Sequence, residues 1–362
     1  MKMTITAHSL QDRETIQAAQ TYMSAHPYVT AYHHIAWLQA VETTYQHSAV
    51  IFIAQIDSNI IGVIPMIHMR RPLLGACLCA LPYCDMGHAL ADDDSTVQAL
   101  TDYVRHYANA NHVRHIEYRN GLAQQPISKD ELAAFTGQKI TMKMPLADNA
   151  QAQMDSYKSK LRSQIRKAQK NGLTVKLSTK TTLLDDFYRV FSHNMRDLGS
   201  PTHSKCWFAN IMSFYQNRAC MAVVYHADQP IGAGIILLQG ELCSIPWAST
   251  INQFNHLAPN MLLYAELIGY AADHNMRQFD FGRSTLNEGT YRFKKQWGAQ
   301  PYPLQWSDLR DEAHAPSSKA QRTPSQKIST SKIKPTLIKV WRKLPLAITT
   351  RLGSQIRGYI SL

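Results

Sequence analysis

The chain has 362 residues, of which 45% are hydrophobic and 18% are charged, so it can bury one or two substantial cores. It contains no run of about 18 apolar residues, and its N-terminal stretch carries acidic residues where a secretory signal peptide needs an apolar segment. We therefore expect a cytoplasmic protein. The six cysteines lie mostly within apolar runs, which is typical of reduced, buried thiols and not of a disulfide framework.

The net charge of +12 is unevenly distributed along the chain. Residues 311–362 hold ten Lys and Arg but only two acidic residues, which gives this segment +8 and leaves +4 for residues 1–310. The body of the protein is therefore nearly neutral. Its charge does not indicate a nucleic-acid-binding protein.

Two apolar runs in the first half predict a β-hairpin. IFIAQI and IIGVIPMI are separated by a turn at residues 57–59, and HHIAW precedes them at residues 33–37. Further on, residues 102–120 combine a helical pattern with a following strand.

The second half repeats this order of elements. A shift of 170 residues places His33, Trp37 and Gly62 on His203, Trp207 and Gly232, and a shift of 163 places Glu117 on Asp280. Order, spacing and element type agree, so we predict an internal duplication. The expected fold class is α/β, with a mixed sheet covered by helices in each of two domains, residues 1–148 and 149–309.

Three further segments have distinct patterns. Residues 150–172 predict one helix with an apolar face, and its opposite face is either solvated or in contact with a phosphate-rich partner. That opposite face carries Lys158, Lys160, Arg162, Arg166, Lys167 and Lys170. Residues 310–332 are rich in Ser, Thr and Pro and predict a flexible linker. Residues 333–362 predict a basic amphipathic tail, split at Pro345, that either contacts an anionic membrane or packs on the body.

The polar residues after the predicted strand RQFDFG are the richest candidates for chemistry. Arg283 and Ser284 follow its carboxyl end, where α/β sheets usually open their clefts, and Arg292, Lys294 and Lys295 add positive charge. This charge could hold a phosphate or stabilise an oxyanion. The alternative is a solvated basic turn anchored by Phe281, Phe293 and Trp297. Strand alternation over residues 291–297 would put Lys294 and Arg292 on one face.

Two cysteine motifs are weaker candidates. CLCALPYC followed by His88 lacks the paired C-x2-C spacing of structural zinc sites, so we predict no metal site. Cys206 lies beside Lys205 and near His203, as an activated nucleophile would, but its neighbours Trp207 and Phe208 indicate a helix that packs on the core.

Several long motifs carry a family resemblance. WASTINQFNHLAPNMLLYAELIGYA, FDFGRST and GTYRFKKQWGA resemble the C-terminal signatures of FemAB-related proteins, especially those found beside exopolysaccharide loci and the PEP-CTERM/exosortase system. SKLRSQIRKAQKNGL, NMRDLGSPTHSKCWF and HHIAWLQAV extend the similarity over residues 26–306. The resemblance implies two tandem GNAT-like domains. The best known members of the family attach amino acids from aminoacyl-tRNA to peptidoglycan precursors, and others resemble acyl-CoA-dependent transferases.

The resemblance also implies an assignment of site residues, with the first domain as scaffold and part of the acceptor cleft, and the second as the transfer site. Lys294 matches the lysine of the family's FK motif, and Arg283 lies next to it in the site. The general base is open between Asp280 and Tyr291. The expected substrate-binding residues are Arg196, Trp247, Ser249, Asn260, Tyr264, Ser284 and Arg292.

The identity of the acyl donor stays open at the level of sequence. Ordinary acetyltransferases cradle the pyrophosphate of coenzyme A with a glycine-rich turn at a helix N-terminus, whereas the matching turn here reads NHLAPNM. We expect no tightly bound cofactor, but a co-substrate that is either aminoacyl-tRNA or acyl-CoA. The expected acceptor is an envelope or exopolysaccharide precursor. The alternative is a non-catalytic accessory protein that binds nucleic acid or phospholipid.

Overall fold

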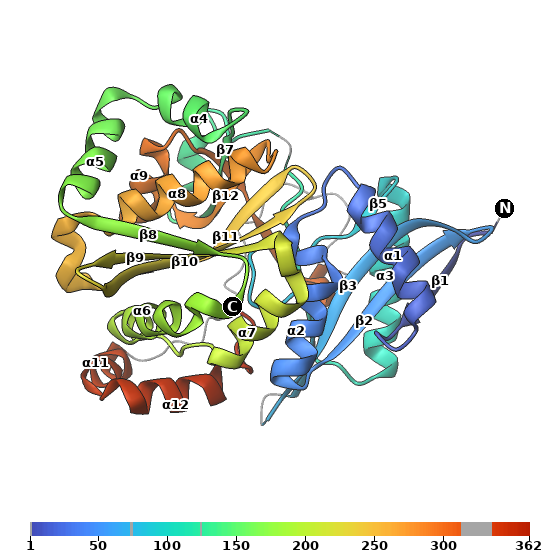
Figure 1. The fold of residues 1–362 in the computed structure, drawn as a ribbon. Helices are drawn as coiled ribbons and strands as arrows, with labels where there is room; N and C mark the ends of the chain where they lie inside the picture. The colour runs from blue at the N-terminus through green and yellow to red at the C-terminus, as the bar shows by residue number, and fades with distance from the viewer. Residues whose placement is uncertain (1, 73–74, 124, 313–334) are drawn as a thin grey trace. The chain divides into compact units, whose positions relative to one another are not determined.

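The computed structural model describes residues 2–72, 75–123, 125–312 and 335–362, and the chain forms two compact units (Figure 1). Unit 1 consists of residues 1–128, 302–331 and 359–362, and unit 2 of residues 129–301 and 332–358. The predicted domains 1–148 and 149–309 are therefore wrong at both boundaries, because neither unit is one continuous stretch of chain.

Unit 1 is an α/β unit. Its elements are β1 (Thr4–His8), α1 (Arg13–Ala25), η1 (Ala31–His33), α2 (Ile35–Tyr45), β2 (Ser48–Ile56), β3 (Asn59–Arg71), β4 (Gly75–Cys79), β5 (Leu90–Ala91), α3 (Asp94–Ala110), β6 (His115–Asn120), β14 (Gln305–Asp308) and α10 (Leu309–Glu312).

Unit 2 repeats the same general order and adds helices. Its elements are η2 (Leu132–Phe135), β7 (Lys139–Pro145), α4 (Ala150–Ser156), α5 (Ser159–Lys170), β8 (Leu173–Ser178), η3 (Thr181–Leu183), α6 (Leu184–Leu198), α7 (Lys205–Tyr215), η4 (Gln216–Arg218), β9 (Ala219–His226), β10 (Gln229–Gln239), β11 (Leu242–Thr250), η5 (Asn252–Leu257), α8 (Pro259–Asp273), β12 (Gln278–Thr285), α9 (Gly289–Gln296), β13 (Gln300–Pro303), α11 (Pro335–Lys343) and α12 (Leu346–Arg357).

The two sheets share the same order over six strands; in addition, β5 pairs with β3 in the first sheet, and β13 lies beyond β7 in the second. One runs β1-β2-β3-β4-β6-β14, and the other β8-β9-β10-β11-β12-β7-β13. Over these six strands the neighbours are antiparallel except for one parallel pair in each sheet, β4 with β6 and β11 with β12. This correspondence confirms the mixed α/β fold and the two tandem domains predicted from the repeat.

One strand of each sheet comes from the half of the sequence that forms most of the other sheet. β7 follows the first repeat but pairs with β12 in the second sheet, and β14 follows the second repeat but pairs with β6 in the first. This exchange of strands is the reason why a single cut at residue 148 does not separate the units.

Both predicted hairpins have the same turn. Asp57 and Ser58 have φ of 48° and 69°, and Ala227 and Asp228 have φ of 46° and 64°. Two successive residues with positive φ make the type I′ turn, whose twist matches that of the flanking strands.

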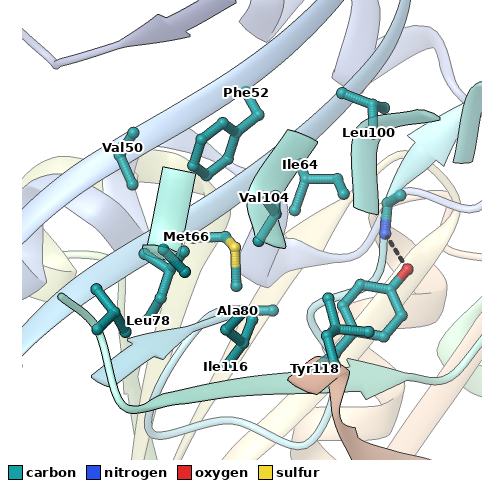
Figure 2. Packing of buried hydrophobic residues seen from close by; sticks show 14 of the residues in the cluster. Val50, Phe52, Ile64, Met66, Leu78, Ala80, Leu100, Val104, Ile116 and Tyr118 are labelled. Carbon is teal, nitrogen blue, oxygen red and sulfur yellow. Dashed lines mark hydrogen bonds between the residues drawn. The ribbon is translucent and has the colours of Figure 1, made fainter. Parts of the chain in front are cut away.

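The core of unit 1 lies between its sheet and α3. Phe52, Ile64 and Met66 from β2 and β3 pack against Leu100 and Val104 of the helix (Figure 2). At the edge of this cluster the Tyr118 hydroxyl accepts a hydrogen bond of 2.9 Å from the Ala89 amide (Figure 2). The buried hydroxyl is thereby satisfied within the core.

Other predicted segments differ from the structure in detail. The helix expected over residues 150–172 is broken at Tyr157 into α4 and α5. The tail is split around Pro345 as expected, into α11 and α12. Most of the predicted linker lies outside the described residues. In the part of the chain that the structure describes, no helix is long and apolar enough to span a bilayer.

Candidate functional site

The most distinctive feature of unit 2 is the point where β11 and β12 stop pairing. Their parallel register covers Leu242–Ser244 against Gln278–Asp280, although β11 continues to Thr250 and β12 to Thr285. The two strands thus separate toward their carboxyl ends. In α/β sheets this is where ligands bind.

Asp280 holds a bulge at this point of β12. The pairing of β12 with β7 shifts register between Asp280 and Arg283. The buried carboxylate of Asp280 accepts hydrogen bonds from the Thr141 hydroxyl at 2.7 Å and from the Gly282 amide at 2.8 Å. Gly282 has φ of +70°, a conformation that favours glycine. The Asp280 side chain and the glycine together fix the local path of the backbone.

Lys294 lies on a helix and not on a strand, so the predicted strand over residues 291–297 is wrong. In α9 the buried residues Tyr291 and Lys294 are three apart, followed by buried Trp297, which is the spacing of one helix face. The Lys294 ammonium donates to the carbonyl oxygens of Gly282 at 2.9 Å and of Arg283 at 2.8 Å. Lys294 is therefore joined to the bulge that Asp280 holds.

An aromatic cluster packs between α9, α8 and β12. The ring of Tyr264 stacks on Phe281, with centroids 5.7 Å apart and planes at 14°, and lies 5.0 Å from Phe293. Trp297 and Tyr157 extend the cluster. Burial raises the pKa of the Tyr264 hydroxyl, which stays protonated at neutral pH. Tyr264, expected to bind substrate, thus belongs to the packing that supports the site.

A second group of predicted residues lies on the side of the sheet that α6 and α7 cover, whereas α8 lies on the other side (Figure 1). Trp247 packs at 5.1 Å from Phe208 of α7, and the Ser249 hydroxyl accepts a hydrogen bond of 3.0 Å from the Asn194 amide group of α6. Arg196, two residues further, forms an ion pair with Asp197 at 2.9 Å. The predicted set is therefore divided between the two faces of one sheet.

The N-terminus of α8 differs from a pyrophosphate-binding turn. Ala258 precedes the helix with φ of +62°, Pro259 occupies its first turn, and Asn260 follows. Proline lacks an amide hydrogen, and the Ala258 amide already donates to the Asn255 carbonyl at 3.0 Å. Two of the backbone donors that such a turn would supply are therefore missing or occupied.

The remaining predicted residues lie around α9 and β12. Arg292 is exposed, and its Nε donates to the Asn287 carbonyl at 3.1 Å. The buried Ser284 hydroxyl has no hydrogen-bond partner among the described residues, and neither has that of Ser244, which stands opposite Asp280 at the last paired position of β11. Sequence reasoning missed Ser244, Thr141 and Asn194. None of the three lies in a recognisable motif, and only strand pairing and packing bring them to the site.

The equivalent position in unit 1 is filled by an ion pair. Arg119 of β6 is 2% exposed; it donates to Glu117 at 3.1 Å and to the carbonyl oxygens of Leu81, Cys84 and Ser361. Burial by itself raises the pKa of Glu117, but Arg119, Ser361 and Arg71 outweigh it and hold that pKa below its ordinary value. Burial also raises the pKa of the neighbouring thiols Cys77, Cys79 and Cys84. Among the described residues, no group of three or more His, Cys, Asp or Glu could hold a metal ion.

Comparison with known proteins gives the fold and the reaction class. Residues 155–295 match the family model described as the acetyltransferase (GNAT) domain. No curated protein matches the chain significantly.

Three solved structures resemble the chain over most of its length. FemX is 16% identical with a TM-score of 0.65, covering 86% of this chain and 98% of FemX. A tandem GNAT protein from the clavulanic acid biosynthesis pathway is 11% identical with a TM-score of 0.54, covering 87% and 100%. The C-terminal domain (DUF2156) of a protein described as a lysylphosphatidylglycerol synthetase, from Agrobacterium fabrum, is 9% identical with a TM-score of 0.51, covering 83% and 93%.

The matched residues 155–295 contain the separation of β11 and β12, the bulge of β12 and nearly all of α9. The two sheets share one order over six strands, as a tandem fold requires. Residues 155–295 therefore match the acetyltransferase (GNAT) domain at the site itself, and the protein is an acyltransferase with a tandem GNAT-like fold.

Proposed function

We propose that the protein transfers an acyl or aminoacyl group to an amine or hydroxyl of a cell-envelope or exopolysaccharide precursor. The acetyltransferase domain supports the reaction type. The resemblance of residues 26–306 to FemAB-related proteins supports the acceptor. A fold neighbour is named for lysylphosphatidylglycerol, an aminoacylated lipid, which agrees with an acceptor from the envelope. In this role the enzyme acts in the cytoplasm, at the inner face of the membrane.

The proposed donor is aminoacyl-tRNA, with acyl-CoA as the rival. The observation that carries this choice is the start of α8, where Pro259 replaces an amide donor and no glycine opens the turn. Helix α5 ends beside this turn, since the Asn171 side chain donates to the Leu257 carbonyl at 3.1 Å. Lys167 and Lys170 are exposed in its last turn and supply positive charge for a phosphate backbone.

In the proposed reaction, the acceptor nitrogen or oxygen attacks the carbonyl carbon of the donor. A new amide or ester bond forms, the bond to the tRNA ribose oxygen or the CoA sulfur breaks, and the proton of the acceptor passes to that leaving group. Lys294 positions the bulge of β12 and places its charge beside the developing oxyanion, together with a backbone amide at the edge of β11. Arg283 holds an anionic acceptor, and Asp280 or Tyr291 is the base. Arg196, which lies on the α6 side of the sheet and pairs with Asp197, has no role in this step.

Donor consumption tests this proposal. Purified protein is incubated with labelled aminoacyl-tRNA or labelled acyl-CoA, with and without a lipid and nucleotide-sugar extract as the source of acceptor. We expect extract-dependent transfer from aminoacyl-tRNA. Charge reversal at Lys167 and Lys170 should raise KM for the donor with little change in kcat, whereas reversal at the exposed Lys2 of unit 1 should change neither.

Two results would contradict the proposal. Transfer from acyl-CoA alone would overturn the choice of donor. Salt-sensitive binding of tRNA or phospholipid without any transfer would favour the accessory role instead of the enzyme.

A further inference from the structure

The two C-terminal helices expose large apolar side chains. Leu337 and Val340 of α11 are 59% and 53% exposed, and Ile348, Leu352 and Ile356 of α12 are 43%, 41% and 42% exposed. The three residues of α12 are four apart, so they form one stripe along the helix. Together these five residues are called the tail face.

The tail face is not the side by which the helices pack on unit 2. Ile338 of α11 lies against Gly199 at the end of α6, where a Cβ on the glycine would approach its Cγ2 to 2.5 Å. Gly353 of α12 lies against Thr202, and Thr349 is buried with it. Both helices thus have a packed side and an apolar side that is left in solvent.

The stripe predicted from sequence is corrected by this packing. At 100° per residue the sequence predicts one stripe made of Leu337, Trp341, Leu344, Ile348, Leu352 and Tyr359. Trp341 and Leu344 are half-buried in the structure, whereas Val340 and Ile356, which the stripe omits, are exposed. The two alternatives for the tail, packing on the body and contact with a partner, are therefore compatible. One side of each helix packs on unit 2, and the opposite side is exposed for contact with a membrane.

Positive charge surrounds the tail face. Lys339, Arg342 and Lys343 of α11 and Arg351 of α12 are exposed. The sequence contains no Asp or Glu between residue 313 and its end at residue 362. Two helices that carry exposed apolar side chains and cations, and no acidic residue of their own, are complementary to a lipid surface with negative headgroups.

We propose that the tail face docks unit 2 onto an anionic membrane, with α11 and α12 lying in the plane of the headgroups. A second copy of the chain fits the same face less well. A twofold interface would set the patch against itself, and the like charges of the two copies would repel each other. Anionic lipid neutralises these charges, while the acyl chains take up the apolar residues.

Truncation of the tail is not a clean test. α11 and α12 cover Gly199 and Thr202, and the Ser361 carbonyl accepts hydrogen bonds from Arg119 and from the Tyr83 amide, at 3.0 and 2.6 Å. Removing residues 332–362 would therefore disturb folding as well as docking. Point substitutions at exposed positions avoid this difficulty.

The test is vesicle flotation of the full-length protein at moderate salt. Vesicles of phosphatidylcholine alone are compared with vesicles that contain about 30% phosphatidylglycerol. The variants are the double substitution Ile348→Gln/Leu352→Gln and the double substitution Arg342→Glu/Lys343→Glu. Leu177→Gln is the matched control, because Leu177 is 40% exposed on β8 of the same unit.

We expect the wild type and the control to float with the anionic vesicles and much less with the neutral ones. The fraction of protein recovered with anionic vesicles should be at least about fivefold lower for each double variant, while Tm is unchanged. Added salt should weaken the binding of the wild type. Absence of flotation of the wild type would overturn the proposal. So would a self-association of the wild type that the same variants abolish, since the tail face would then be an interface between copies.

Discussion

At the scale of single residues, Lys294 differs most between sequence and structure. Strand alternation over residues 291–297 places Lys294 beside Arg292 in the polar surroundings of a cleft or of solvent, and so predicts that loss of this lysine leaves folding intact. In the structure its side chain is 7% exposed, and its ammonium is bonded to two carbonyl oxygens of the β12 bulge. A buried lysine that satisfies carbonyl groups contributes to stability as well as to chemistry.

We therefore predict that Lys294→Ala lowers both stability and activity. Loss of its hydrogen bonds should cost about 1–3 kcal/mol of unfolding free energy, and displacement of the bulge should lower kcat at least about tenfold. Thermal melting and single-turnover transfer measure the two effects.

Lys295→Ala is the matched control for this prediction. Lys295 is the next residue of α9 and is exposed, with its ammonium 5.5 Å from the centre of the Tyr291 ring. It should change neither Tm nor kcat appreciably. If Lys294→Ala melts lower but retains its kcat, Lys294 has a structural role only.

Arg119 is a second residue whose role the structure revises. The sequence, in which no FKK-like segment follows Arg119, predicts that its substitution disturbs activity much less than that of Arg283. Arg119 is instead a buried charge, paired with Glu117. Removing one partner of a buried ion pair leaves the other uncompensated, so its substitution affects the folding of unit 1.

At the scale of secondary-structure elements, the predictions succeeded where a pattern is local. Both hairpins were predicted from apolar runs around a turn, and the helices that precede the last repeated strands were predicted from their periodicity. The sequence did not predict α9, because this helix is only eight residues long and the spacing of its aromatic residues fits the alternation of a strand as well as the period of a helix. The break at Tyr157 was missed because its apolar stripe continues across the break.

The exchange of β7 and β14 leads to a prediction about fragments. Residues 129–301 contain β7 and every other strand of the second sheet, apart from the last two residues of β13. Residues 149–309 lack β7, which leaves one edge of β12 without its ladder partner, and they carry β14 without β6. An unpaired edge exposes backbone donors and acceptors and favours aggregation.

Both fragments lack α11 and α12, so both lose the packing of these helices on α6. Of the two, we expect fragment 129–301 to be the more soluble and to unfold the more cooperatively in urea. Fragment 149–309 should aggregate or unfold without a clear transition. Circular dichroism and size-exclusion chromatography compare them directly. Equal stability of the two fragments would mean that β7 adds little to the second sheet.

At the scale of the whole molecule, His33 of unit 1 and His203 of unit 2 are buried at equivalent positions of the repeat. Burial lowers the pKa of His33 to about 4 and that of His203 well below its ordinary value. The Thr30 amide donates to Nδ1 of His33 at 3.2 Å, and Nε2 donates to the His88 carbonyl at 3.0 Å. These bonds fit the neutral ring, because a proton on Nδ1 would displace the Thr30 amide.

Because the pKa of both histidines is lowered in the folded state, we predict that the protein loses stability in mild acid. The unfolded chain takes up a proton near pH 6.5, whereas folded His33 does so only near pH 4, so the unfolded state binds more protons between these values. Stability is therefore complete above pH 6.5 and falls as the pH drops toward 4, by about 3 kcal/mol for His33. The lowered pKa of Glu117 acts in the same direction.

Urea unfolding between pH 7 and pH 5 measures this effect. His33→Gln should be less stable at pH 7 but should depend less on pH than the wild type. His106→Gln, at an exposed position on α3, should keep the pH dependence of the wild type. An unchanged pH dependence in His33→Gln would show that another group causes the acid instability.

The sequence by itself determined the duplication, the hairpins, the α/β class and the motifs of the second half, because these depend on residues close together in the chain. Only the tertiary structure decided which half supplies β7 and β14, that Asp280 and Lys294 hold one bulge, and that Glu117 and Arg119 fill the corresponding place in unit 1. Strand pairing and burial join residues far apart in sequence, and periodicity carries no information about such partners. The same reason applies to the tail, where packing on α6 decides which apolar residues stay in solvent.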